Sequence, residues 1–483
     1  MPHKPATFRH PPRRRYRGVS RRVRNTYGRN VRRRARGLPG LWARFRRLLW
    51  AWWLWGGIAV VLAVLDRWKT LPIAAALAFI AHITYPRELP PIYGLDHEFG
   101  VDSDAFLATV TGTTGVEFVD GNRIEILNNG DEFYPSMLAA VEAARSSITI
   151  EAYIYWAGTI GRRFAEALAA KARQGVSIKI LLDAIGSSNI GEEILRILDG
   201  AGCQIAWFHP IRWYTLGRFN NRTHRKSLII DGAVAFTGGA GIADHWLGNA
   251  QDEEHWRDMQ IRMEGPAVAS LQSAFAQGWL ETTGELITGG AYYPSAGIAG
   301  DVPLQVVLSS PETGSSAVRI MYYLSIVCAR KSIWIANPYF VPDQVAIDIL
   351  VDAQNRGVDV KIMVAGRCND SRLARFCGKR LYGSLLECGV EIFEYNRTML
   401  HHKIMIVDGC WATVGTTNFD NRSFSHNAEN NVCFRDRASV SALEAAFRRD
   451  LAACDPVGLR SWRRRPLWSK AFEGIASLLQ DQV

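Results

Sequence analysis

The sequence predicts an α/β protein made of two lobes with mixed sheets, each a copy of one unit, preceded by a helical membrane hairpin. Two observations support this prediction. Four stretches within residues 119–295 are similar to four stretches within residues 296–455, and each pair is separated by 177 to 187 residues. Ahead of both copies, Leu48 to Leu65 is a run of eighteen residues without a charge, long enough to cross a bilayer as a helix.

The repeated stretches alternate between strand-like and helical patterns. In the first copy, Ala-Arg-Ser-Ser precedes ITIEAYIYW, and in the second copy Ala-Arg-Lys-Ser precedes IWIANPYF. The stretch VSIKILLD is similar to VDVKIMVA, and CQIAWF is similar to VEIFEY. Amphipathic runs at 162–173 and 345–355 lie between these strands and are typical of helices. We therefore assign residues 119–295 to the first lobe and residues 296–455 to the second.

The N-terminal part divides into three segments. Residues 1–47 form an Arg-rich tail, 48–86 a membrane hairpin of one or two spans, and 87–118 a linker punctuated by Pro and Gly. The second apolar run of the hairpin, Leu71 to Tyr85, is short for a span. The tail places the N-terminus in the cytoplasm by the positive-inside rule, so two crossings leave the lobes facing the cytoplasm and one crossing leaves them outside.

Charge is concentrated in the tail. The chain carries a net charge of +11, but residues 1–47 contain 16 Arg and Lys4 without an acidic residue, which leaves −6 for the rest. A mildly acidic body argues against a nucleic-acid channel across it, whereas the basic tail suits anionic lipid head groups or RNA. The eight cysteines show no paired or zinc-like spacing and are interpreted as reduced thiols.

The motif His-x-Lys followed by four residues and Asp occurs once in each lobe. On a strand, alternate residues share a face, so each copy offers an imidazole beside an ammonium. The Asp of each copy lies on the opposite strand face, where a structural salt bridge is the expected role. The candidate catalytic residues of the two motifs are His224, Lys226, Asp231, His401, Lys403 and Asp408.

The double motif resembles that of the phospholipase D superfamily, and the chain is most similar to bacterial cardiolipin synthases. The resemblance rests on the stretches GNRIEILNNGDEFYPSMLAAVEAARSSITIEAYIYW, HRKSLIIDGAVAFTGG, ARKSIWIANPYFVPD and HHKIMIVDGCWATVGTTNFDNRSFSHNAEN. It implies two phospholipase D-like lobes and transfer of a phosphatidyl group through a covalent phosphohistidine, with no metal and no cofactor.

The resemblance also implies roles for the motif residues. His224 would be the nucleophile, and His401 the acid that protonates the leaving glycerol and then the base that activates the acceptor alcohol. An imidazole suits either role because its pKa lies near neutrality. Lys226 and Lys403 would bind the phosphate and neutralise the charge that spreads over it in the transition state.

Further residues follow from the same comparison of the two lobes. Glu429 matches the family's histidine-orienting acid, and Asp258 is the candidate for its counterpart, with an ordinary strand carboxylate as the alternative for each. Asn418 would donate its amide to a phosphate oxygen, but Gly241 stands at the equivalent place in the first lobe. We expect Gly241→Asn to raise turnover if this missing donor limits it.

The function expected from these features is a membrane-anchored cardiolipin synthase of the bacterial inner membrane, active as a monomer because both motifs lie in one chain. Its partners would be the bilayer, anionic head groups and phospholipid substrates, with phosphatidylglycerol as the donor, and not nucleic acid. The alternatives are a phospholipase D that hydrolyses phospholipids to phosphatidic acid, and a membrane scaffold with a weak site.

The C-terminal segment, 456–483, departs from the repeat. Its basic cluster precedes a helix whose apolar residues share one face, which fits either an interfacial helix or packing on the body. These apolar residues are Leu467, Trp468, Ala471, Phe472, Ile475 and Leu478.

Overall fold

The computed structural model describes residues 99–211, 220–295, 297–311 and 316–477, together with Ile58, Pro72 and Gln480. The predicted tail, 1–47, and the predicted hairpin, 48–86, lie outside the described residues apart from Ile58 and Pro72. In the described ranges, no helix combines the length and the apolar character that a membrane span needs. The chain divides into the units Met1–Asp96 and His97–Val483, and the helices and strands below belong to the second.

The first lobe contains eight strands and four α-helices among its described residues. The strands are β1 (Val119–Asn128), β2 (Ser147–Ala152), β3 (Ser177–Asp183), β4 (Gln204–Phe208), β5 (Arg222–Thr223), β6 (Ser227–Ile230), β7 (Val234–Gly238) and β8 (Met259–Glu264). The helices are α6 (Asn129–Ala143), α7 (Thr159–Arg173), α8 (Glu192–Asp199) and α9 (Val268–Thr283), with a 3₁₀ turn, η2 (Asp244–Trp246).

The second lobe repeats this plan and extends it at the C-terminus. Its strands are β9 (Val302–Ser309), β10 (Ser332–Ala336), β11 (Phe340–Val341), β12 (Asp359–Ala365), β13 (Glu391–Tyr395), β14 (Lys403–Val407), β15 (Trp411–Gly415), β16 (Phe419–Asp420), β17 (Asn427–Phe434) and β18 (Cys454–Pro456). Its helices are α10 (Ala317–Val327), α11 (Gln344–Asn355), α12 (Arg372–Glu387), α13 (Asn421–Ser425), α14 (Arg437–Leu451), α15 (Leu459–Arg463) and α16 (Leu467–Ala476).

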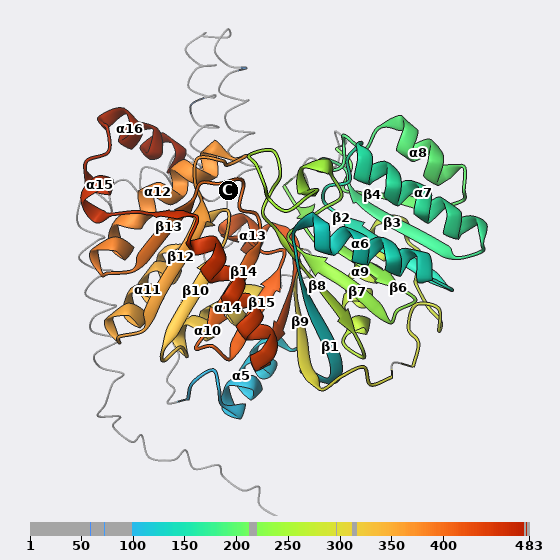
Figure 1. Ribbon diagram of the computed structural model, residues 1–483, viewed down its shortest axis with the longest axis horizontal. Helices are drawn as coiled ribbons and strands as arrows, with labels where there is room; N and C mark the ends of the chain where they lie inside the picture. Colours follow the sequence, from blue (N-terminus) through green and yellow to red (C-terminus); the bar gives the residue numbers. More distant parts are fainter. Residues whose placement is uncertain are drawn as a thin grey trace, which may run out of the picture. The chain divides into compact units, whose positions relative to one another are not determined.

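The mixed sheets of the two lobes are joined into one (Figure 1). The strand order is β4-β3-β2-β6-β7-β8-β1-β9-β17-β15-β14-β10-β12-β13-β18, and β1 pairs antiparallel with β9 where the lobes meet. Read outward from this boundary, the two halves have the same order, with β8 matching β17, β6 matching β14 and β2 matching β10. The predicted duplication is therefore visible strand by strand.

Apolar side chains of the predicted helices cover the sheet. In α7, which contains the predicted run 162–173, Ile160, Phe164 and Leu168 recur every four residues and are buried, as one face of a helix requires. The predicted run 345–355 likewise lies within α11. Phe275 of α9 and Phe447 of α14 belong to one core cluster that spans both lobes.

The predicted linker, 87–118, contains a helix that the sequence analysis did not identify. Helix α5 (Asp104–Thr114) is capped at its N-terminus by Ser103, whose side chain accepts a hydrogen bond from the N–H of Phe106. Phe106 is fully buried, and its ring meets Trp411 edge to face at 5.1 Å between centroids. This part of the linker is thus packed onto the second lobe.

Candidate active site

The two His-x-Lys segments lie just before strands β6 and β14. The prediction that His224 and Lys226 share a strand is wrong in detail, because β6 begins at Ser227, one residue after Lys226. Likewise, β14 begins at Lys403, so His401 precedes it. The imidazoles therefore belong to the segments that enter the strands, at the end of the sheet where β2 and β10 finish.

Each of these segments pairs with the main chain of the opposite lobe. Strand β5 runs parallel to β17, and the N–H of His224 donates to the carbonyl of Ala428 at 2.9 Å. In the other direction, the N–H of His401 donates to the carbonyl of Arg257 at 2.8 Å. Both histidines are consequently held against the lobe that does not carry them.

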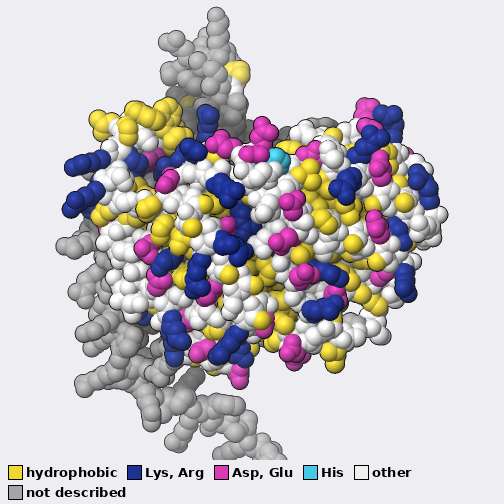
Figure 2. Space-filling model, in the orientation of Figure 1, with side chains coloured by type: hydrophobic (Ala, Val, Ile, Leu, Met, Phe, Trp, Pro, Cys, Tyr) yellow, Lys and Arg dark blue, Asp and Glu magenta, His cyan; other side chains and the backbone are white. Residues whose placement is uncertain are grey.

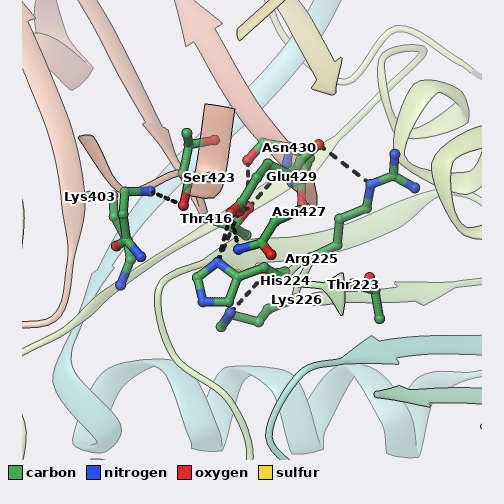
Figure 3. Close-up of polar contacts among 12 residues, drawn as sticks. Thr223, His224, Arg225, Lys226, Lys403, Thr416, Ser423, Asn427, Glu429 and Asn430 are labelled. Carbon is green, nitrogen blue, oxygen red and sulfur yellow. Dashed lines mark hydrogen bonds and ion pairs between the residues drawn. The ribbon is translucent and has the colours of Figure 1, made fainter. Parts of the chain in front are cut away.

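This crossed pairing decides which carboxylate meets which imidazole. Nδ1 of His224 lies 3.0 Å from both carboxylate oxygens of Glu429 (Figure 3), and Nδ1 of His401 lies 2.8 Å from Oδ2 of Asp258. The sequence predicts both acids but not their pairing. The structure shows that each acid comes from the lobe opposite to its histidine.

The two carboxylates are supported by different neighbours, which the sequence analysis did not assign. The hydroxyl of Thr416 donates to Glu429 at 2.5 Å, and the side-chain amide of Asn427 donates to the same carboxylate at 3.3 Å. The indole N–H of Trp246 donates to Asp258 at 2.9 Å. Thr416 stands eight residues after the motif Asp, but no local pattern in the sequence signals the indole.

The two motif lysines are buried, and the charge of Lys403 acts on Lys226. Burial, followed by the neighbouring Lys403 cation, lowers the pKa of Lys226 to about 7. Burial lowers the pKa of Lys403 to about 8, against the opposing effect of Asp258 and Glu429. Two desolvated ammonium groups in one site are suited to a bound anion, because the anion offsets their mutual repulsion.

The imidazoles are neutral near pH 7. Burial, assisted by the Lys226 cation, lowers the pKa of His224 to about 4, although Glu429 opposes this shift. The pKa of Glu429 is itself lowered, because His224, Lys226 and the Thr416 hydroxyl together outweigh the effect of burial. A neutral His224 that donates from Nδ1 to an ionised Glu429 leaves Nε2 with a free lone pair, the form that a nucleophile needs.

His401 is in a different environment. Burial and the Lys403 and Lys226 cations hold the pKa of His401 well below its usual value. Trp246 and Trp256 lie against its ring, with centroids 5.5 Å and 5.2 Å away. An anion bound between the lysines would offset the cations and raise the affinity of His401 for a proton.

The motif aspartates lie at the far ends of their strands from the motif histidines, and a catalytic role for them stays a prediction. Asp231 follows β6, and its carboxylate accepts hydrogen bonds from the main-chain N–H groups of Arg145, Ser146 and Ser147 at 2.7 to 2.9 Å. Asp408 makes the same contacts with residues 330–332. Main-chain N–H groups thus hold both carboxylates.

The backbone explains why this position suits Asp. The φ angles of Asp231 and Asp408 are 52° and 55°, in the left-handed region, and each residue is followed by a Gly in the turn that leads to the next strand. Asp tolerates this conformation better than most side chains. These residues therefore fasten a turn to the start of β2 or β10.

The residue between His and Lys differs between the motifs. Arg225 is buried and donates to the carbonyls of Ala274 and Ser309 at 3.0 and 3.2 Å, which ties α9 to β9. His402 takes this place in the second motif and is fully buried, with its ring 4.0 Å from Asp450. His402 is therefore a packed residue of the interior.

Asn418 follows β15 and is buried. Its main-chain N–H donates to the hydroxyl of Ser423 at 3.2 Å, while its side-chain oxygen is buried without a hydrogen-bond partner among the described residues. Its role as a phosphate donor stays a prediction.

Gly241 has no room for the Asn expected at this position. A Cβ atom there would lie 2.7 Å from the carbonyl oxygen of Ile154 and 3.1 Å from the indole ring of Trp246. Trp246 fills the space that a longer side chain would need and uses its N–H for Asp258. We therefore expect Gly241→Asn to crowd Ile154 and Trp246 and not to raise turnover.

Two other histidines, His245 and His255, follow the first motif in the sequence. His245 is packed among Trp156, Trp246 and Trp256, and His255 contacts Asp252 at 2.6 Å. In the part of the chain that the structure describes, no three His, Cys, Asp or Glu side chains are grouped so that they could hold a metal ion.

Known proteins that are similar to this chain match it in both lobes. Residues 137–279 and 325–451 match the family described as cardiolipin synthase, PLD-like domain. A cardiolipin synthase of Alkalihalophilus pseudofirmus is 34% identical over 376 residues, which cover 77% of this chain and 74% of the relative. A probable cardiolipin synthase of Bacillus subtilis, YwiE, is 34% identical over 359 residues, or 74% of this chain and 71% of the relative.

A solved structure supports the fold alone. The phosphatidylserine synthase of Haemophilus influenzae superimposes with a TM-score of 0.59 at 13% identity, covering 78% of this chain and 99% of that protein. The family match and the curated relatives carry the assignment further. The chain belongs to the cardiolipin synthase-like family of the phospholipase D superfamily and is a phosphatidyltransferase.

Proposed function

We propose that this phosphatidyltransferase is a membrane-anchored cardiolipin synthase that joins two phospholipids through a phosphohistidine. The observation that carries the proposal is the crossed arrangement of two carboxylate-bound imidazoles beside two buried lysines. Displacement at a phosphodiester needs a nucleophile, a proton donor for the leaving alkoxide and cations at the phosphoryl oxygens, and this arrangement supplies all three.

The first half-reaction transfers the phosphatidyl group to the enzyme. Nε2 of His224 attacks phosphorus, the P–N bond forms and the bond to the glycerol oxygen breaks. His401, protonated once the substrate anion offsets Lys226 and Lys403, gives its proton to the departing glycerol. Glu429 stabilises the positive charge that develops on His224.

The second half-reaction restores the enzyme. Neutral His401 removes the proton from a hydroxyl of a second phospholipid, whose oxygen attacks phosphorus as the bond to His224 breaks. The same scheme with water as acceptor gives phosphatidic acid, the product of the hydrolytic alternative. Phosphatidylglycerol is the proposed donor because its leaving group is glycerol.

Lipid mass spectrometry in bacterial cells that lack cardiolipin tests this function. We expect cardiolipin when the wild-type chain is expressed and none with His224→Ala. Cardiolipin from both, or from neither, would reject the proposal, and phosphatidic acid in its place would favour the hydrolase. If the wild-type chain and His224→Ala alter the membrane equally and neither makes a lipid product, the scaffold is favoured.

Membrane anchoring by residues 48–86, with the lobes facing the cytoplasm, belongs to the same proposal. It is supported by the uncharged run and the Arg-rich tail before it. Labelling of thiols introduced in the tail and in an exposed loop of a lobe tests the topology. Labelling of the tail and the lobe from opposite sides would reject a hairpin.

A further inference from the structure

Helix α16 has one packed face and one exposed apolar face. Glu473 and Ala476 are buried, whereas the large apolar side chains on the other side are exposed to solvent. These exposed side chains are Leu467 at 82%, Trp468 at 62%, Phe472 at 56% and Ile475 at 62%. They gather in one yellow patch at the upper left of Figure 2, over the position of α16 in Figure 1.

The packed face fixes α16 to the body. Glu473 is 2% exposed and forms an ion pair with Arg465 at 2.6 Å. The carbonyl of Ala476 accepts a hydrogen bond from the thiol of Cys377 in α12 at 3.2 Å. Just before the helix, the indole N–H of Trp462 donates to the carbonyl of Lys379 at 2.7 Å. The exposed face is therefore held in place by contacts on the other side of the helix.

The same packing places α16 next to a strand that leads to the candidate active site. Ala476 and Cys377 share a small apolar cluster with Val341 of β11. Strand β11 pairs with β16, which begins at Phe419, the residue after Asn418. A short chain of direct contacts thus links the exposed helix to the site.

The charge around the patch is positive. Residues 457–477 contain four Arg and Lys470, and their single acidic residue, Glu473, is buried in its ion pair. Arg460, Arg464 and Lys470 are exposed, and Arg463 pairs with Glu387 of α12. An apolar face containing Trp and Phe beside Arg and Lys is the composition of helices that lie in a lipid interface.

We propose that α16 docks on the surface of an anionic bilayer, with Leu467, Trp468, Phe472 and Ile475 in the interface and the basic residues at the head groups. An apolar patch alone would also suit a second protein, and the flanking positive charge favours anionic lipid. The docking segment is far along the sequence from the proposed anchor at residues 48–86. It would hold the site against the membrane that contains the substrates, and in this respect it rests on the proposed function.

Photo-crosslinking of the full chain tests the docking. The protein is reconstituted in vesicles of phosphatidylglycerol and phosphatidylcholine that contain a phospholipid with a diazirine in its acyl chain, and adducts are mapped by mass spectrometry. Leu286 and Ile298 are matched controls, because they are apolar and 69% and 85% exposed but lie elsewhere. We expect roughly tenfold more adducts on 467–477 than around the controls, and fewer in vesicles of phosphatidylcholine alone.

Adducts on 467–477 that do not exceed the controls would overturn the proposal. A photoreactive amino acid placed at position 468 tests the other occupants, because crosslinks from it to a second copy or to residues 1–96 would assign the face to them and overturn the proposal. Because the readout is a lipid adduct, it does not depend on which reaction the enzyme performs. Absence of cardiolipin synthesis with normal adducts would therefore reject the proposed function and leave the docking intact.

A paired variant separates docking from folding. Trp468→Ser with Phe472→Ser changes two exposed side chains, so the thermal unfolding of the body should stay as in Leu286→Ser. We expect roughly tenfold fewer adducts, and a matching fall in the ratio of turnover on vesicles to turnover on dispersed short-chain phospholipid. An unchanged ratio together with unchanged adducts would contradict the docking.

Discussion

Glu429→Gln should slow the nucleophilic attack by His224, which lies in the other lobe. The substitution keeps the size of the side chain and removes the negative charge from the acceptor that His224 contacts twice at 3.0 Å. Hydrogen bonds to a charged group contribute about 1.5–3 kcal/mol, and loss of a buried charge partner costs about 3–5 kcal/mol. At 1.36 kcal/mol per tenfold, this range of about 1.5–5 kcal/mol predicts that formation of the phosphatidyl-enzyme slows by roughly 10- to 5,000-fold.

A substrate with an activated leaving group makes this test specific. p-Nitrophenol leaves as a stable anion, so a phosphatidyl p-nitrophenyl ester needs His224 as nucleophile but does not need a proton from His401. In detergent micelles, Glu429→Gln should abolish the burst of p-nitrophenol. The matched variant Asp258→Asn should keep the burst, slow the following turnover and accumulate the phosphatidyl-enzyme.

The outcome also decides between the two histidines. If Asp258→Asn removes the burst and Glu429→Gln retains it, His401 is the nucleophile and the proposed roles are reversed. If both variants remove the burst while their unfolding curves match wild type, the assignment of separate roles to the two carboxylates is wrong.

Further predictions concern pH, positioning and turn residues. kcat/KM should fall as pH rises through about 7, because Lys226 loses its charge there, and should fall again toward pH 4 as His224 is protonated; a flat profile would contradict both assignments. Trp246→Phe keeps a ring but removes the donor to the orienting acid, so turnover with phosphatidylglycerol should drop roughly 10- to 100-fold while the p-nitrophenol burst persists; loss of both would indicate a packing defect instead. Gly241→Ala places a methyl 2.7 Å from a main-chain oxygen and should lower the free energy of unfolding by about 1–3 kcal/mol in urea titrations, and an unchanged midpoint would refute the proposed crowding. Asp231→Ala should lower that free energy by about 1–3 kcal/mol, and a fully stable but inactive variant would restore this residue to the chemistry.

The duplication was predictable because its signals are local. Strand and helix patterns such as those of α7 and α11 depend on residues a few positions apart. A stretch that could be a helix or a strand in one copy is easier to assign when the other copy shows the same pattern. Helix α5 was missed because it is short and lies in a segment rich in Gly and Pro, and its burial depends on Trp411, far along the chain.

The geometry of the site depends on contacts that no local pattern contains. His224 and Glu429 are 205 residues apart, and His401 and Asp258 are 143 residues apart. Spacing therefore indicated which residue types were needed but not which acid serves which imidazole. The same limit applies to Gly241, where alignment of the copies revealed a missing side chain but not the indole that occupies its space.

The crossed carboxylates have a consequence for how such a chain could arise and change. A lobe by itself carries an imidazole without its acid and an acid without its imidazole, so a single copy would have to associate with another to build either half of the site. Fusion of two copies removes the requirement that both stay identical. The two acid environments differ in this chain, with an indole beside Asp258 and a hydroxyl beside Glu429. An ancestor reconstructed from one lobe should therefore be inert as a monomer and regain its site on dimerisation.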